Sequence, residues 1–204
     1  MDIENIDRLR ANLSVKSKNG IDFIFSAGII WAMIAFIWTL DYSTYNKSVY
    51  TFIAGGLMMP LALLFSKLFK TTWTDKENPL QPLGLKINFS QLFYFPFLIF
   101  SLVKFPDYFV MVYAIITGAH FYLYSWFYKT NLYAVFAGVI SAGAMILGFL
   151  LTPEKMYVIP LLMSLCLFLL AVLLFFDSRQ KAKSTKSRID EIIYQPEAEE
   201  DFHL

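Results

Sequence analysis

Six long apolar runs dominate the sequence and limit most strongly what the chain can fold into. A helix that crosses a bilayer needs about 20 mostly apolar residues. Backbone groups in hydrocarbon must be hydrogen-bonded within the protein, so helix is the state expected for each run. The runs cover residues 21–40, 49–69, 89–103, 108–128, 132–151 and 156–176. We therefore predict an all-α fold, a polytopic membrane protein with a bundle of six transmembrane helices.

Composition supports this class and excludes others. The chain is 57% hydrophobic and only 16% charged, whereas soluble domains are about 25% charged. A net charge of +1 provides no basic field, so we expect no nucleic-acid partner. Cys166 is the one cysteine, which excludes an internal disulfide. The first apolar run follows a polar start and lacks a cleavage site, so we interpret it as a retained helix and not as a signal peptide.

The positive charges are divided unequally between the two ends of the predicted spans. Fourteen of the 17 Lys and Arg fall on the side of both termini, and Lys47, Lys104 and Lys155 fall on the other. The positive-inside rule then places both termini in the cytoplasm and the chain in the cytoplasmic (inner) membrane. We divide the chain into a cytoplasmic amphipathic segment (1–19), the six-helix domain (20–177) and a charged cytoplasmic tail that we expect to be disordered (178–204).

The polar segments carry weaker signals. Apolar residues within 2–16 recur at helical spacing, which favours an interfacial helix, although a frayed, solvated terminus is the alternative. We expect the basic part of the tail to bind anionic headgroups and its acidic end, PEAEEDFHL, to be disordered, with a short helix around RIDEIIY as an alternative. Residues 70–86 contain Pro79, Pro82 and Gly84, which predicts a turn-rich loop.

Small residues and a proline suggest how the spans pack. In the fifth run, Ala134, Gly138 and Ala142 recur every four residues, as do Ala137 and Ser141, which predicts a central helix in the bundle. In the second run, the paired glycines and Pro60 of AGGLMMP predict a kink. The similar helix ends FSKLFKT (65–71) and YSWFYKT (124–130) are compatible with three repeated helical hairpins, or with cytoplasmic helix ends of the ordinary kind.

Polar residues inside the apolar runs are the candidate functional residues, because they are costly in lipid and usually face the bundle interior. Tyr113, Thr117, His120 and Tyr124 share one helix face by spacing. Together with polar residues near the same end of other runs, they predict a cytoplasm-facing cavity closed at depth by the histidine. The candidates for binding a ligand or proton are His120, Asp22, Gln91, Tyr113, Thr117, Tyr124 and Ser125.

His120 admits three interpretations. It is a neutral imidazole hydrogen-bonded to a neighbour, or a group that exchanges protons or contacts a ligand, or a metal ligand. The third is disfavoured, since no carboxylate stands at ligand spacing on the same helix. We therefore expect no metal and no cofactor. Asp22 has a simpler interpretation as a carboxylate at a helix N-terminus.

Enzyme signatures are missing from the chain. It contains no G-x-S-x-G, H-E-x-x-H, Walker A or G-x-G-x-x-G motif. A Ser/His pair assembled from different helices is left open, but the pattern favours a protein that is not an enzyme.

Two stretches, KENPL…LG (76–84) and MVYAIITGAHFYLYSWFYK…YAVF (111–136), carry a resemblance. In them the chain resembles an uncharacterised family of small bacterial multi-pass membrane proteins. The resemblance implies a bacterial inner-membrane protein and no particular activity. The family-like residues are Glu77, Asn78, Pro79, Gly84, Tyr113, Gly118, His120, Ser125, Trp126 and Tyr128; of these, Glu77 and Asn78 are the candidate loop residues.

Two functions of different class follow. The first is binding or transport of a small solute, with proton coupling as one variant, through the cavity around His120. The second is a non-catalytic membrane scaffold that binds a protein partner through the 70–86 loop or the tails. A lipid-acting enzyme ranks third. The lipid bilayer is the one partner that the composition itself requires.

Overall fold

Spans one, five and six each contain one long helix, whereas a glycine pair accompanies the division of span two and Pro96 follows the interruption of span three. The computed structural model describes residues 3–194, and the side chains of residues 4–187. The α-helices are α1 (Ile3–Lys16), α2 (Ile21–Thr39), α3 (Thr44–Gly55), α4 (Met58–Phe69), α5 (Gln81–Ser90), α6 (Phe95–Lys104), α7 (Phe109–His120), α8 (Tyr122–Phe127), α9 (Leu132–Leu150) and α10 (Val158–Tyr194). Short 3-10 turns connect several of them: η1 (Lys18–Gly20), η2 (Gln91–Tyr94), η3 (Pro106–Tyr108) and η4 (Pro153–Lys155).

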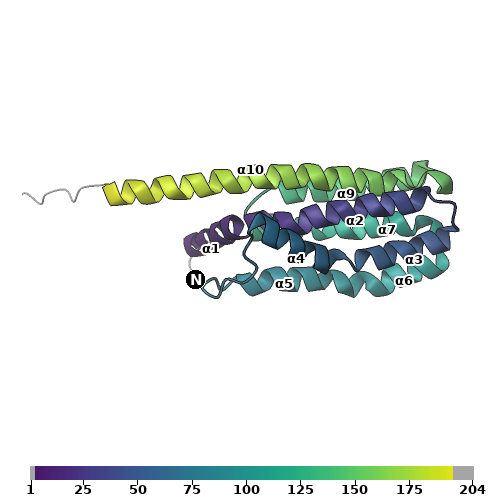
Figure 1. Ribbon diagram of the computed structural model, residues 1–204, viewed down its shortest axis with the longest axis horizontal. Helices are drawn as coiled ribbons and strands as arrows, with labels where there is room; N and C mark the ends of the chain where they lie inside the picture. Colours follow the sequence, from purple (N-terminus) through teal and green to yellow (C-terminus); the bar gives the residue numbers. More distant parts are fainter. Residues whose placement is uncertain (1–2, 195–204) are drawn as a thin grey trace, which may run out of the picture.

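The predicted six spans are confirmed. Within the described residues, six helical segments are long and apolar enough to cross a membrane. They are Lys18–Thr39, Thr44–Phe69, Gln81–Lys104, Pro106–Phe127, Leu132–Leu150 and Pro153–Ser187. The spans lie side by side in an elongated bundle, and α10 extends beyond it at the end where α1 lies (Figure 1).

The core of the bundle is centred on α2. In its most apolar stretch 61% of the residues are buried, against 11% in spans two and three. Ile34 and Trp38 of α2 and Leu167 and Leu170 of α10 are almost fully buried. The Ser164 hydroxyl of α10 donates to a backbone carbonyl of α2, so the polar group that enters this interface is satisfied.

The two most extensive helix–helix interfaces are those between α2 and α10 and between α7 and α9. These contacts pair span one with span six and span four with span five. Spans one and two also pack extensively, through α2 with α3 and α4, whereas spans three and four share fewer contacts, so only part of the expected hairpin pattern is present.

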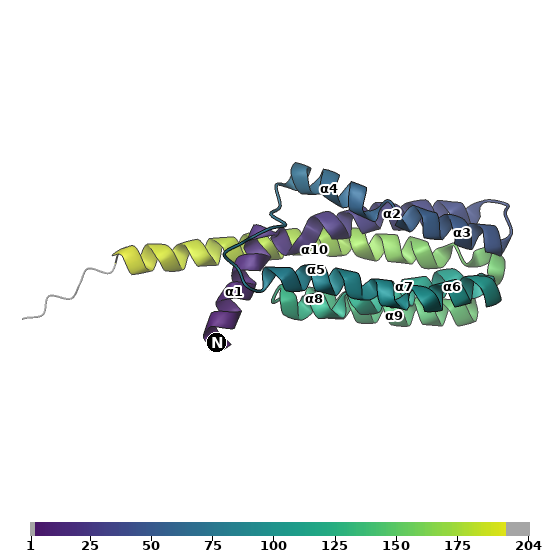
Figure 2. The same cartoon turned by 90° about the horizontal axis from the view of Figure 1, so that it is seen from below.

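The prediction that span five is central is wrong. Helix α9 lies at one side of the bundle (Figure 2), and it buries Ala137, Ile140, Ala144 and Gly148. The regular stripe of Ala134, Gly138 and Ala142 is not buried, and a Cβ added to Gly138 would meet no atom within 4 Å. Spacing of small residues marks a face that can pack closely, but the neighbouring helices decide which face is used.

The predicted kink in span two is confirmed as a two-residue turn, Gly56 and Leu57, between α3 and α4. The hydrogen bonds at the break are short-range turns, from the Gly56 amide to the Ile53 carbonyl and from the Leu57 amide to the Ala54 carbonyl. A Cβ on Gly55 would lie 2.7 Å from the Tyr113 hydroxyl, so glycine at this position lets α7 approach the break. Beyond the break, α4 leans away from α5, as Figure 2 shows.

The turn-rich loop is shorter than predicted. Helix α5 begins at Gln81, so residues 81–86 are helical and the loop covers 70–80. Proline is tolerated in the first turn of a helix because its missing amide has no partner there, so Pro82 marks a helix start and not a turn. Span three is thereby longer than the predicted 89–103 run, and η2 interrupts it before Pro96 of α6.

The tail also differs from the prediction. Helix α10 continues past the apolar run to Tyr194, so residues 178–194 of the expected disordered tail are helical. Arg, Lys, Gln and Ala are good helix formers, and no glycine or proline intervenes before Pro196. The acidic end, residues 195–204, lies outside the described residues. The predicted N-terminal helix is confirmed as α1, and its position on a leaflet stays a prediction.

Candidate functional site

The structure separates the predicted site residues into groups at the α1 end of the bundle. Asp22 forms one group with the loop that precedes α5. Its Oδ2 accepts hydrogen bonds from Thr71 Oγ1 at 2.6 Å and from Trp73 Nε1 at 2.5 Å, and its Oδ1 accepts from its neighbour's amide. The side chain is almost fully buried. Asp22 therefore anchors the loop, and its hydrogen bonds do not reach Gln91, His120 or Tyr124, with which we had grouped it.

The structure brings two of the candidates, Gln91 and Thr117, together. The Gln91 amide of η2 donates to the Thr117 hydroxyl of α7 across 3.3 Å. Thr117 is buried, so this bond is a polar contact between spans three and four inside the apolar layer. The Ser141 hydroxyl of α9 donates to the Ile115 carbonyl of α7, the helix that also carries Thr117. Span four is thus the helix on which the polar contacts of this region converge.

His120 lies at a discontinuity of span four. Helix α7 ends at His120 and α8 begins at Tyr122, and turn-like bonds run from the Phe121 amide to Gly118 and from the Tyr124 amide to Phe121. The imidazole meets the Tyr124 ring almost perpendicularly, with the centroids 5.4 Å apart. Only 7% of the residue is exposed, and Nε2 has no hydrogen-bond partner among the described residues. The simplest interpretation, a histidine fully satisfied by its neighbours, does not fit this nitrogen.

Tyr124 belongs to a buried tyrosine cluster that sequence reasoning did not find. The rings of Tyr124, Tyr128 and Tyr133 lie with centroids 5.5–5.9 Å apart. The Tyr133 hydroxyl donates to the Asn19 carbonyl at 2.6 Å. Burial raises the pKa of Tyr128, which lies between spans four and five, well above its usual range, so its phenol stays protonated. The cluster leads from His120 to the polar residues at the end of the bundle.

Those polar residues centre on Asn19, which has left-handed backbone angles (φ 56°) between α1 and α2. Its amide donates to the Leu174 carbonyl and to Asp177 Oδ2 of α10, while its oxygen accepts from the Ser14 hydroxyl of α1. Lys181 pairs with Asp177 at 2.7 Å and donates to Ser14 Oγ. The Asn-Gly dipeptide (19–20) is a turn signal that could have drawn attention to this position.

The loop candidates have different environments. Asn78 is buried, its amide donates to the Leu9 carbonyl of α1 at 2.9 Å, and its oxygen accepts from the Leu80 amide. Glu77 is exposed and lies 4.0 Å from Lys16. Asn78 is thus a structural residue that ties the loop to α1, and Glu77 is free to meet solvent.

The remaining candidates, Tyr113 and Ser125, lie apart from the histidine's ring contacts. Tyr113 packs on Trp31 of α2, with ring centroids 5.2 Å apart. Ser125 lines a surface pocket of about 470 Å³, together with residues from α1, α8 and the turn before α9. The other lining residues are Arg10, Tyr122, Trp126, Lys129, Thr130 and Asn131. Among the residues searched, no cluster of three or more His, Cys, Asp or Glu is positioned to hold a metal ion.

Six apolar helices and a polar network at one bundle end define a multi-pass, all-α membrane protein. A comparison with family models assigns the chain more closely. A family of unknown function, DUF7010, matches residues 6–177, and the chain belongs to this family. No curated protein and no solved structure matches the chain. This match confirms the prediction that the chain belongs to an uncharacterised family.

Proposed function

We propose that this membrane protein binds a small polar solute at His120. The observation that carries the proposal is the buried Nε2 atom without a hydrogen-bond partner. Leaving a buried polar atom unpaired costs about 1–3 kcal/mol, and such groups inside membrane spans are usually functional. A neutral imidazole offers an acceptor or a donor at this nitrogen, depending on its tautomer. A solute that can hydrogen-bond fits this atom.

The surroundings supply a second point of recognition and a means of access. Thr117 lies one turn before His120 on α7, and its hydroxyl accepts a hydrogen bond from the Gln91 amide of the neighbouring span. The turn between α7 and α8 falls at Phe121, directly after the histidine, and helix discontinuities in membrane proteins often coincide with binding sites. Spans two and three bury only 11% of their most apolar stretches, so these spans have the fewest contacts to lose when a solute enters. If the bound solute is also carried across the membrane, the protein is a transporter, with or without coupling to protons.

The test compares His120→Leu with Ser101→Ala. Ser101 Oγ of α6 is the other buried side-chain atom without a partner among the described residues, so both variants remove an unpaired polar atom. Small molecules that co-purify with the detergent-solubilised protein are identified by mass spectrometry. Proton flux is measured in proteoliposomes that contain a pH-sensitive dye. We expect His120→Leu to lose the co-purified molecule, and any proton flux, and Ser101→Ala to keep them.

Thermal unfolding separates a lost site from a lost fold. Because His120 Nε2 has no partner to lose, His120→Leu should unfold at the same temperature as the wild type or higher. An unchanged set of bound molecules in a folded His120→Leu variant would refute the proposal.

The outer faces of spans two and three favour the second candidate, a partner-binding membrane protein. Phe93 is 84% exposed, and Leu64 and Leu68 of α4 are also exposed. Lipid or a partner helix covers such faces in a membrane. Cross-linking from cysteines placed at Leu68 and Phe93 in membranes tests this alternative, which predicts one defined cross-linked product and not a diffuse set.

A further inference from the structure

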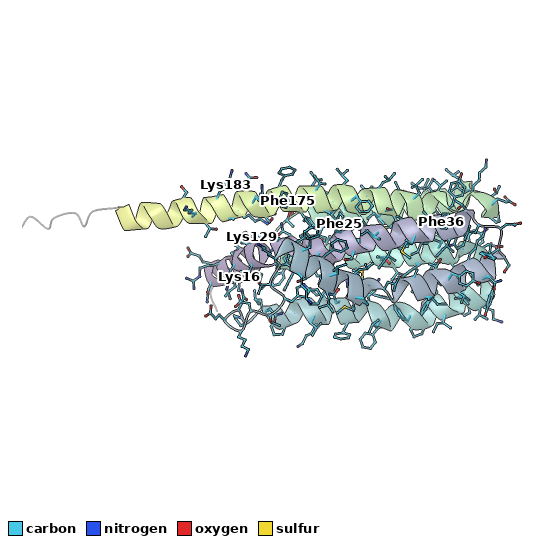
Figure 3. The ribbon with its side chains drawn as sticks, viewed as in Figure 1. Lys16, Phe25, Phe36, Lys129, Phe175 and Lys183 are labelled. Carbon is cyan, nitrogen blue, oxygen red and sulfur yellow. The ribbon has the colours of Figure 1, made fainter. Side chains whose placement is uncertain are left out.

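The pocket beside Ser125 carries an inference that is independent of His120. We propose that it binds the phosphate group of an anionic phospholipid, held between Arg10 of α1 and Lys129 of the turn before α9. The pocket opens at the surface of the bundle, at the α1 end where Lys16 and Lys129 lie and beyond which Lys183 extends (Figure 3). Three features support this site: the two cations, the aromatic side chains around the pocket and the N-terminus of α9.

Arg10 is held in position before any ligand binds. Its Nε donates to the Trp126 carbonyl at 2.5 Å, and its guanidinium carbon lies 4.7 Å from the centre of the Trp126 ring. Only 14% of the side chain is exposed. Arginine forms fork-shaped contacts with phosphate, and a guanidinium already oriented by an indole loses little freedom on binding.

A carboxylate already occupies the position between the two cations. Asp7 Oδ1 lies 2.8 Å from Arg10 Nη1, and Asp7 Oδ2 lies 2.8 Å from Lys129 Nζ. Arg10 and Lys129 are therefore close enough for one small anion to contact both. Asp7 itself is 39% exposed by its side chain, so it can turn aside when a phosphate with more acceptor oxygens arrives.

The back of the pocket offers neutral donors. Thr130 is 7% exposed and lines the pocket, and its hydroxyl is a potential donor to a bound anion. Asn131 precedes α9 but its side chain does not cap the helix. The first amides of this 19-residue helix therefore point their partial positive charge toward the same region.

The rim of the pocket favours a lipid over a free phosphate. Tyr122 and Trp126 are 65% and 47% exposed on span four, and Leu123 between them is 48% exposed. Aromatic side chains of this kind mark the boundary between hydrocarbon and water. A headgroup in the pocket would leave its acyl chains beside Leu123, on the lipid-facing side of α8. The bound lipid would also join α1 to span four.

The experiment measures lipid binding to the full chain in detergent by native mass spectrometry. The probes are phosphatidylglycerol, phosphatidylcholine and glycerol 3-phosphate. Arg10→Gln/Lys129→Gln is compared with Lys67→Gln/Lys70→Gln, which removes two exposed charges at the same bundle end. We expect phosphatidylglycerol to bind the wild type preferentially, and about 30-fold more weakly to the pocket variant. The control should lose less than threefold.

A third variant gives a change of opposite sign. Asp7→Asn removes the competing carboxylate, so phosphatidylglycerol should bind several-fold more tightly. This result also guards against misfolding, since a damaged site would not gain affinity. Equal losses in the pocket and control variants, or no gain in Asp7→Asn, would overturn the proposal. Full competition by glycerol 3-phosphate would overturn the assignment to a lipid.

Discussion

At the scale of single residues, most buried polar side chains of the described residues have hydrogen-bond partners, and His120 Nε2 and Ser101 Oγ are the two atoms that do not. Asp22 accepts from Thr71 and Trp73, and the Asn19 side chain forms hydrogen bonds with two helices, α1 and α10. Buried polar groups in lipid must find partners within the protein, which explains why these two residues have structural roles. The unpaired His120 nitrogen differs from these satisfied groups, and it is the atom at which we propose that a ligand binds.

Two carboxylates, Asp7 of α1 and Asp75, each pair with a lysine and give the position of this helix a pH dependence. The hydrogen bond from Lys129 lowers the pKa of Asp7, and the hydrogen bond from Lys16 lowers the pKa of Asp75, each from about 3.8. A lowered folded-state pKa means that the ion pair stabilises the docked helix above pH 3.8 and loses this effect as the pH falls through the lowered value. We expect α1 to loosen below about pH 3.8.

Spin labels at Arg8→Cys and Lys183→Cys, with Cys166→Ser, measure this loosening as a broader distance distribution. In the Asp7→Asn/Asp75→Asn background the distances should be insensitive to pH. A wild-type distribution that is unchanged down to pH 3 would contradict the prediction.

At the scale of helices, two helices pack closely where a single glycine lies at their interface. A Cβ at Gly118 of α7 would lie 2.6 Å from Ile140 Cγ2 and 2.9 Å from Ser141 Oγ of α9. The glycine therefore lets α7 and α9 touch along one of the longest interfaces of the bundle. Gly138 of α9 meets no such neighbour, although the spacing of small residues had marked it for packing.

These two glycines make a matched pair for mutagenesis. Gly118→Ala should destabilise the protein by about 1–3 kcal/mol, since the added methyl forces the helices apart. Gly138→Ala should be neutral or stabilise by up to about 1 kcal/mol, because alanine is the better helix former. Unfolding by a denaturing detergent measures both. A larger loss for Gly138→Ala would show that this face packs against another helix in the membrane.

At the scale of the whole molecule, six spans leave both ends of the described chain on the same side of the bundle. Helix α1 and the extension of α10 share that end (Figure 1), and most of the positive charge lies there. The charge asymmetry supports a cytoplasmic position for this end.

Single cysteines test the orientation after Cys166→Ser removes the native thiol. Lys155→Cys, in η4 at the opposite end, should react with an impermeant maleimide added outside intact cells. Lys183→Cys, in the extension of α10, should react only after the membrane is opened. Labelling of Lys183→Cys in intact cells would reverse the topology that we expect.

Much of the architecture could be predicted from the sequence, because spans and breaks depend on local properties. Apolar length alone predicts six helices in lipid, and the glycine pair marks the division of span two. The sequence underestimates the extent of α5 and α10, because Pro82 predicts a turn and the charged residues after Asp177 predict a disordered tail. Pro82 is compatible with a helix start, and the charges are compatible with a helix that leaves the membrane.

The sequence by itself determined that the chain forms six spanning helices and that His120 is an ionisable group within a span. Only the tertiary structure decided which side chains contact the buried polar residues. It joined Asp22 to Thr71 and Trp73, placed Gln91 beside Thr117, and left His120 against Tyr124 with one nitrogen unpaired. The physical reason is that helix formation follows from neighbours along the chain, whereas the partner of a buried polar group is set by which helix faces meet.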